Sequence, residues 1–150
     1  MTEHRRHQPR RAALRVLYAA DVSDTGADEA LRTMRQSLAD EDDDPTPYWS
    51  DVVERVRPII ERREEIDDEI RHLDTDWRID RMAAVDRNLL RLGIFEILEQ
   101  DVPPLVTINA CVELAKEFGT ATTPGFINGL LDQLCQNHDI PIESKKSSSD

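Results

Sequence analysis

Apolar residues recur at three- and four-residue steps along most of the chain, which is the spacing of one face of an amphipathic helix. After a polar lead, the first such series is Ala12, Ala13, Val16, Leu17 and Ala20. The same spacing predicts helices near residues 30–38, at 48–73 with a kink at Pro58, at about 82–98, at about 107–118 and from 123 onward. No strand pattern or fixed-period repeat competes, so the sequence predicts an all-α fold, a helical bundle.

Turn-forming residues mark the ends of these segments. Residues 40–47, an aspartate-rich string followed by Pro45 and Pro47, predict an acidic loop because proline cannot continue a helix. Asp80 is expected to cap the helix that follows it, and Thr123 with the next proline is expected to open the last helix. We therefore expect a flexible basic arm at 1–9, one helical domain at 10–138 with subdomains at about 10–73 and 74–138, and a disordered tail at 139–150.

Length and composition favour a single soluble domain. The chain has 150 residues, of which 39% are hydrophobic and 33% charged. No apolar run approaches the roughly 20 residues that a membrane span requires, and no secretory signal follows Met1, so we expect a cytoplasmic protein with no membrane partner. Cys111 and Cys135 lie among apolar residues at helical spacing, which favours buried thiols over a disulfide or a metal site.

The net charge of −12 is unevenly distributed. Residues 1–20 contain five arginines and one glutamate, a sum of +4, which leaves −16 for the rest of the chain. This asymmetry favours an anionic partner at the amino-terminal end and a basic macromolecule on the acidic body, and ordinary solvated charge is the alternative. Tyr18 lies two helical turns beyond Arg10 and Arg11, where a nucleic-acid base could stack on its ring; a place in the core is the alternative.

The sequence carries no catalytic constellation. Its four histidines fall in the polar lead, at a helix end and near the tail, and it has no zinc-ligand motif and no phosphate-binding glycine loop. The many carboxylates lie at solvent-facing helical positions, where solvation accounts for them. We therefore expect no enzymatic activity, no metal and no cofactor.

Three stretches resemble the signature regions of the NusB family of antitermination factors. They are RRAALRVLYAADV, VDRNLLRLGIFEIL and VPPLVTINACVELAKEFGTATTPGFINGLLDQL. The third is the most specific, because a proline-bearing connector, an Ile-Asn pair and Phe-Ile-Asn-Gly-Leu-Leu-Asp follow one another in the family's order. The resemblance covers about Arg10 to Leu134 and implies about seven helices in two packed subdomains of three to four helices each.

The resemblance also implies a function in transcription antitermination. Such a factor binds the boxA element of single-stranded leader RNA from ribosomal RNA operons together with NusE, a small-subunit ribosomal protein. It acts indirectly with other Nus factors and RNA polymerase to promote read-through. By matching positions, the residues implied to contact RNA are Arg6, Arg10, Arg11, Tyr18, Thr122 and Phe126. Asp86 is implied to face NusE.

Other matched residues are expected to be structural. Arg91 and Glu96 lie on the nearly all-apolar helix and should find partners inside, because an unpaired buried charge is costly. Asn128 and Gly129 are interpreted in the same way, with Gly129 allowing two helices to approach closely.

Three other functions stay open at this stage. Ribosomal RNA cytosine methyltransferases carry a related amino-terminal domain, but this sequence ends before a methyl-donor domain. A protein-binding helical adaptor or homodimer that acts without RNA also fits an acidic bundle. A helix-turn-helix DNA-binding protein ranks last. Its recognition helix would need a face of basic residues, whereas the segment 78–91 combines charged residues with apolar ones.

Overall fold

The computed structural model describes residues 3–73, 75 and 78–142, with side chains described from residue 8 onward. The backbone of these residues forms helices and no strand, which confirms the all-α fold. The α-helices are α1 (Glu3–Ser23), α2 (Ala27–Asp40), α3 (Trp49–Glu61), α4 (Arg63–Arg71), α5 (Ala84–Glu99), α6 (Pro104–Phe118) and α7 (Thr123–Asn137). Two 3-10 turns, η1 (Thr46–Tyr48) and η2 (Ile79–Arg81), lie between them.

The chain divides into two compact units, an amino-terminal unit of Met1–Arg62 and a carboxy-terminal unit of Arg63–Asp150. The division falls where α3 ends, earlier than the boundary near residue 73 that the sequence suggests. The long helix expected at 48–73 is two helices, broken at Arg62 with φ −110°. The break lets Val56 and Ile59 pack within the first unit, while Ile66 and Ile70 pack within the second.

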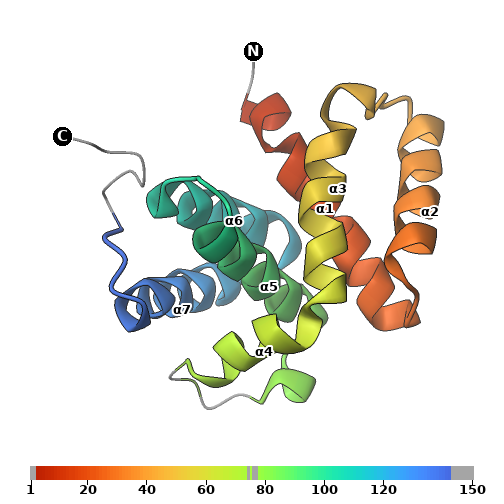
Figure 1. Ribbon diagram of the computed structural model, residues 1–150. Helices are drawn as coiled ribbons and strands as arrows, with labels where there is room; N and C mark the ends of the chain where they lie inside the picture. Colours follow the sequence, from red (N-terminus) through yellow and green to blue (C-terminus); the bar gives the residue numbers. More distant parts are fainter. Residues whose placement is uncertain (1–2, 74, 76–77, 143–150) are drawn as a thin grey trace. The chain divides into compact units, whose positions relative to one another are not determined.

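The amino-terminal unit is built on α1. Figure 1 shows α3 running across α1, with α2 beside them, and all three helices contact one another. The apolar stripe of α1 is fully buried, as its spacing predicts: Ala12, Ala13, Val16, Leu17 and Ala20 are at most 3% exposed. The helix begins at Glu3, within the residues expected as an arm, and it contains Pro9, which has no N–H to donate to the preceding turn.

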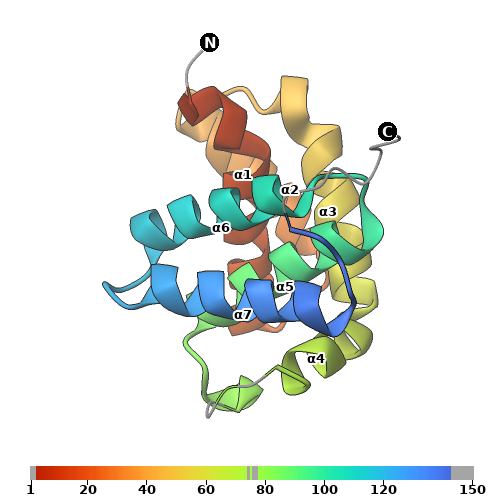
Figure 2. The ribbon, with the colours of Figure 1, turned by 90° about the vertical axis from the view of Figure 1, so that its left-hand side faces the viewer.

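The carboxy-terminal unit is built around α5. Figure 2 shows α6 and α7 side by side, with α5 packed against both, and α4 also contacts α5. Every residue of α5 from Asn88 to Ile97 is buried, which confirms that this nearly all-apolar helix is central. Cys111 and Cys135 are buried thiols that form no disulfide with each other, as predicted.

Close helix approach in this unit depends on Gly93, and the prediction for Gly129 is wrong. A Cβ on Gly93 would lie 2.7 Å from the Leu131 Cδ1 atom, and the Leu131 side chain is fully buried. Nothing lies within 4 Å of a Cβ built on Gly129, which is exposed on α7 beside an exposed Asn128. Gly129 therefore faces solvent, and the close approach of α5 to α7 is made at Gly93 on α5.

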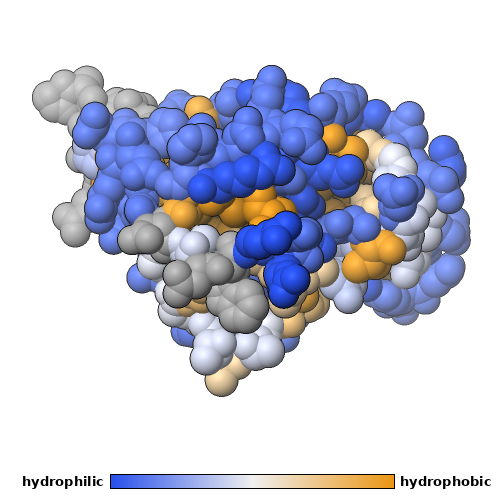
Figure 3. Space-filling model, turned by 90° about the horizontal axis from the view of Figure 1, so that it is seen from below, coloured by the Kyte–Doolittle hydropathy of each residue, from blue (hydrophilic) through white to orange (hydrophobic). Residues whose placement is uncertain are grey.

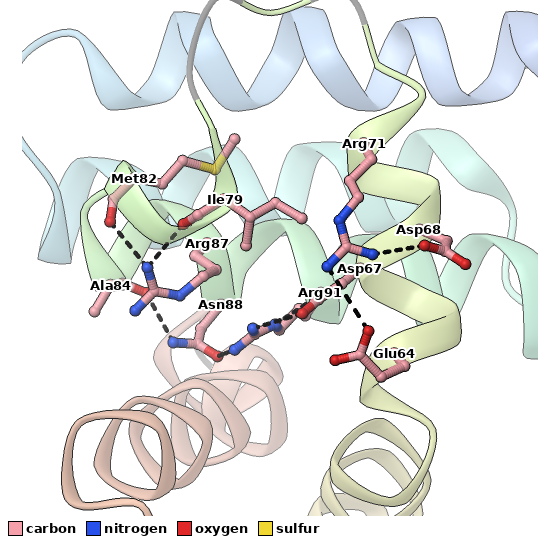
Figure 4. Close-up of polar contacts among 10 residues, drawn as sticks. All are labelled: Glu64, Asp67, Asp68, Arg71, Ile79, Met82, Ala84, Arg87, Asn88 and Arg91. Atoms are coloured by element: carbon pink, nitrogen blue, oxygen red, sulfur yellow. Dashed lines mark hydrogen bonds and ion pairs between the residues drawn. The ribbon is translucent and has the colours of Figure 1, made fainter.

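A buried ion pair joins α4 to α5. Arg91 donates from Nε to Asp67 Oδ1 at 2.8 Å and from Nη2 to Asp67 Oδ2 at 2.9 Å, a bidentate geometry (Figure 4). Arg91 also donates to Asn88 Oδ1 at 3.0 Å, and Asn88 donates to the Ala84 carbonyl at 2.8 Å. The expectation that Arg91 finds a buried partner is confirmed.

Glu96 meets the same expectation. Its Oε1 accepts a hydrogen bond from the Thr107 hydroxyl on α6 at 2.8 Å, and both side chains are fully buried. Thr107 lies within α6, which begins at Pro104 rather than near residue 107, because proline is favoured in the first helical turn.

The start of α5 differs from the sequence prediction. Asp80 does not cap this helix, whose N-cap position is Ala83 without a side-chain hydrogen bond. Instead the Arg87 guanidinium donates to the carbonyls of Ile79 and Met82, both at 3.0 Å, and so fixes the η2 turn to the first turns of α5 (Figure 4). The prediction failed because the turn at 79–81 uses Asp80 inside its own 3-10 helix.

Outside these cores, hydrophilic side chains dominate the face that is drawn in Figure 3. On the face drawn in Figure 3, hydrophilic side chains cover most of the area and hydrophobic ones appear in small separate patches. Such a distribution is ordinary for a folded chain with 33% charged residues, so a binding surface has to be argued from particular side chains.

We expect Asp67→Asn to lower the free energy of unfolding by about 3 kcal/mol, because it leaves the buried Arg91 guanidinium without its charged partner. Asp68→Asn is the matched control, since Asp68 is the next residue and forms an exposed ion pair with Arg71, worth about 1 kcal/mol or less. Urea denaturation followed by circular dichroism measures both. Equal losses for the two variants would contradict this role of Asp67.

Candidate functional site

Two of the basic side chains predicted on α1 are described, and both are partly exposed to solvent. Arg10 and Arg11 are half-buried, and Tyr18, seven residues beyond Arg11, is 42% exposed. The ring of Tyr18 is therefore on the surface, and the alternative of a core tyrosine is wrong. Arg6 lies in the helical backbone of α1, but its side chain is outside the described residues.

Arg15 belongs to the same face of α1, although the sequence analysis assigned it no role. It is four residues beyond Arg11 and three before Tyr18, the steps that place side chains next to one another on a helix. Its Nη2 donates to Glu41 Oε2 at 3.2 Å. That helical spacing was the signal that could have identified Arg15.

The connection from α2 to α3 brings carboxylates to this arginine face. The Tyr48 hydroxyl donates to Asp43 Oδ2 at 3.3 Å. Burial, and then the nearby Asp43 carboxylate, raise the pKa of Tyr48 to about 12, and the positive charges of Arg15 and Arg11 oppose that rise. Tyr48 therefore lies within the electrostatic reach of both arginines and of the acidic loop.

The other three predicted residues meet in the carboxy-terminal unit. Asp86 from α5, with Thr122 and Phe126 from the start of α7, line one open pocket of about 540 Å³. The same pocket is lined by Arg81, Met82 and Ala83, which the sequence analysis did not single out. They directly precede α5, so their nearness to Asp86 in the sequence was the available signal.

Thr123 connects the two walls of this pocket. Its buried hydroxyl accepts a hydrogen bond from the Thr120 N–H at 3.0 Å and donates one to Asp86 Oδ1 at 3.1 Å. Gly119 allows the turn to close, because a Cβ there would lie 2.6 Å from the Thr123 Cβ. The turn between α6 and α7 is thereby fixed to the first turn of α5.

The carboxyl group of Asp86 is partly desolvated in this position. Burial raises its pKa above the ordinary 3.8, and the hydrogen bond from Thr123 opposes the rise. The carboxylate accepts the hydrogen bond from Thr123 and borders an open pocket, so a basic group entering the pocket would stabilise its charged form.

The pocket brings together polar, charged and aromatic groups that can bind a ligand. The pocket offers a carboxylate, a guanidinium from Arg81, an exposed hydroxyl from Thr122 and the half-buried ring of Phe126. A second pocket of about 570 Å³ contains none of the predicted residues; it is lined by Ile70, Arg71, Leu73, Thr75, Arg78, Ile79 and Asp80. Across the described residues there is no group of three or more His, Cys, Asp or Glu side chains that could hold a metal ion.

Fold and site together define a class: an all-helical protein of two small units that presents a basic, aromatic helix face and a mixed polar and aromatic pocket. In the part of the chain that the structure describes, no helix is both long and apolar enough to cross a membrane.

Comparison with known proteins identifies the family. The model of the NusB family matches residues 7–136. The transcription antitermination protein NusB of Anaeromyxobacter sp. (strain Fw109-5) is 38% identical over 147 residues, covering 95% of this chain and 96% of the relative. That of Myxococcus xanthus (strain DK1622) is 40% identical over 134 residues, covering 86% and 93%. The chain belongs to the NusB family, whose curated relatives are transcription antitermination factors rather than enzymes.

Solved structures agree with this assignment. T. maritima NusB superposes with a TM-score of 0.74 at 33% identity, covering 87% of this chain and 90% of that one. A chain in the complex of the antitermination factors NusB and NusE with double-stranded RNA has a TM-score of 0.75 at 26% identity, covering 91% and 99%. The fold of this chain is therefore that of NusB.

We expect Asp86→Asn to make the protein more stable than the wild type at pH 7, by an amount that narrows toward pH 4. Because burial raises the pKa of Asp86, its carboxyl stabilises the fold below the unfolded pKa, and this stability is lost as pH rises through the folded pKa. The amide oxygen can still accept the Thr123 hydrogen bond. Urea denaturation at a series of pH values measures the difference, with the exposed Asp101→Asn as control. A difference that does not vary with pH would refute the titration of Asp86 as its cause.

Proposed function

We propose that this protein is a transcription antitermination factor that binds boxA-type leader RNA of ribosomal RNA operons together with a NusE-type ribosomal protein. The observation that carries the proposal is the match to antitermination proteins over nearly the whole chain, one structural relative being a complex of NusB and NusE with double-stranded RNA. In this proposal the protein acts in the cytoplasm, contacts RNA polymerase and other Nus factors indirectly, and catalyses no reaction.

The RNA surface in this proposal includes the outer face of α1. Arg10 and Arg11 would contact phosphates, as guanidinium groups do through paired N–H donors, and Arg6 would extend the row at the start of the helix. Tyr18 supports the assignment because its exposed ring is available to stack on an unpaired base. A helix that carries both charge and an exposed ring suits single-stranded RNA, whose bases are accessible.

The pocket in the carboxy-terminal unit supplies the remaining contacts. Phe126 and Thr122 would meet RNA at the start of α7, while Asp86 would receive a basic side chain of the NusE-type partner. Supporting this division, Asp86 carries a desolvated carboxylate at the edge of an open pocket, where an arriving lysine or arginine would lower its pKa. The net charge of −12 also favours a basic protein as partner.

The proposal is tested by titrating fluorescent boxA-like RNA and a scrambled control with the protein alone and with its NusE-type partner present. We expect weak binding alone, and tighter, sequence-selective binding with the partner, because the partner neutralises acidic surface and the two equilibria are coupled. If neither state prefers boxA, and sedimentation shows a stable dimer that RNA does not alter, the RNA-independent adaptor is the better description.

Replacing Arg10 and Arg11 together by Ala should weaken RNA binding about tenfold or more, since each lost arginine–phosphate contact costs about 1 kcal/mol. Heterodimer formation with the NusE-type partner should be unchanged. Fluorescence anisotropy measures the first, and sedimentation the second. The control replaces Arg32 and Arg78, two exposed arginines outside this surface, which changes the net charge equally. If the two double variants have equal RNA affinities, α1 is not part of the RNA-binding surface.

Asp86→Lys should have the converse effect. It places a positive charge where the proposed partner brings one, so pairing with the NusE-type protein should weaken about tenfold or more, while RNA binding by the isolated protein should persist. Isothermal titration calorimetry measures the pairing, and circular dichroism checks the fold. Asp86→Asn serves as the milder variant that keeps the Thr123 hydrogen bond. Undiminished pairing by the folded Lys variant would show that Asp86 does not face the partner.

A further inference from the structure

A fourth side chain completes the arginine and tyrosine face of α1. Arg15 follows Arg11 by one helical turn and precedes Tyr18 by three residues, so the three side chains share one strip of the helix surface. Arg15 has the geometry to extend a row of phosphate contacts toward the ring of Tyr18, but its guanidinium is already paired with a carboxylate of the acidic loop.

Glu41 holds the Arg15 guanidinium through one oxygen of its carboxylate. Its Oε2 accepts from Arg15 Nη2 at 3.2 Å and from the Ser37 hydroxyl at 3.4 Å. The Arg15 and Glu41 side chains are 32% and 49% exposed, so RNA can reach the pair from solvent. An exposed ion pair of this kind contributes about 1 kcal/mol or less, which makes exchange of a carboxylate for a phosphate feasible.

The acidic loop has a defined conformation that presents Glu41 to α1. The end of α2 is closed by hydrogen bonds from Asp43 N to the Leu38 carbonyl at 2.9 Å and from Asp42 N to the Ala39 carbonyl at 3.1 Å. Asp42 adopts φ 65°, a left-handed conformation in which glycine is favoured after a helix. An aspartate there adds negative charge next to Glu41 despite the backbone cost.

The far end of the loop is held independently of α1. Arg35 donates to the Thr46 hydroxyl at 3.1 Å, and its guanidinium lies 5.5 Å from the centre of the Trp49 ring. Thr46 N donates to Asp44 Oδ1 at 3.1 Å, and hydrogen bonds from Thr46 lower the pKa of Asp44. Figures 1 and 2 both show this connection at the end of the unit where α1 begins.

We propose that Arg15 is a further RNA-contacting residue and that Glu41 masks it, so that the acidic loop acts as an intramolecular competitor for leader RNA. The inference rests on the proposed function, because it requires that α1 bind RNA. When RNA binds, a phosphate displaces the Glu41 carboxylate from the Arg15 guanidinium, and the rest of the loop keeps its position on Arg35 and Trp49. The protein alone then binds RNA more weakly than it would if Arg15 were not paired with Glu41.

The test compares two variants that each remove one negative charge from an exposed ion pair of the same unit. Glu41→Gln releases Arg15, whereas Asp28→Asn releases Arg57 and serves as the matched control. We expect Glu41→Gln to tighten RNA binding about two- to fivefold more than Asp28→Asn does. The slope of log affinity against log salt should also steepen by about 0.7 for one added phosphate contact.

The same pair of substitutions is then repeated in an Arg15→Gln background, with circular dichroism confirming the fold of each variant. The advantage of Glu41→Gln over Asp28→Asn should disappear there, because the masked group is absent. If Glu41→Gln and Asp28→Asn increase RNA affinity equally, the effect comes from net charge alone. If the larger increase for Glu41→Gln persists in the Arg15→Gln background, Glu41 does not act through Arg15. Either result overturns the inference. If the wild-type protein does not bind RNA, and the Arg10 and Arg11 variants have the same RNA affinity as the wild type, RNA binding by α1 is refuted. The inference is then refuted as well.

Discussion

The bidentate ion pair between Arg91 and Asp67 is the constraint on which the carboxy-terminal unit depends. Asp67 and Arg91 are each only 5% exposed, and buried charges of this kind are tolerated only when they are paired. The register in which α4 packs against α5 is therefore the one that brings the two side chains together. From Arg91 the hydrogen bonds continue through Asn88 to the Ala84 carbonyl in the first turn of α5. That turn also carries Asp86, so the helix segment that bears the pocket residue is tied to the buried ion pair.

A second network fixes the other wall of the pocket. Thr123 begins α7, accepts from the Thr120 backbone and donates to Asp86, so one hydroxyl sets both the turn and the carboxylate. Glu96 and Thr107 join α5 to α6 in a similar way deeper in the unit. The proposed binding groups on α5 and at the start of α7 are therefore positioned by polar contacts, which are directional where apolar packing is not.

Periodicity predicted the helices well because each apolar stripe has its own buried face. The stripe of α1 and the all-apolar stretch of α5 are buried as expected, and the buried partners of Arg91 and Glu96 followed from the cost of an unpaired charge. The break at Arg62 was not predictable from spacing, since the pattern continues across it and only packing into different units separates α3 from α4.

The candidate site was predictable in its residues more than in its arrangement. Family positions named Asp86, Thr122 and Phe126, but no spacing rule indicates that side chains so far apart in the chain line one pocket. Gly129 shows the opposite error: a glycine in a stretch that matches the family motif suggested close packing, whereas the tight contact is made by Gly93 against Leu131. Contacts between helices depend on register and rotation, which a single sequence does not encode locally.

The shared pocket has a genetic consequence. Asp86, assigned to the protein partner, and Phe126, assigned to RNA, border the same space and are linked through Thr123 to one turn. Substitutions of Thr123 should therefore be pleiotropic and disturb both interactions at once, because its hydroxyl connects the two walls.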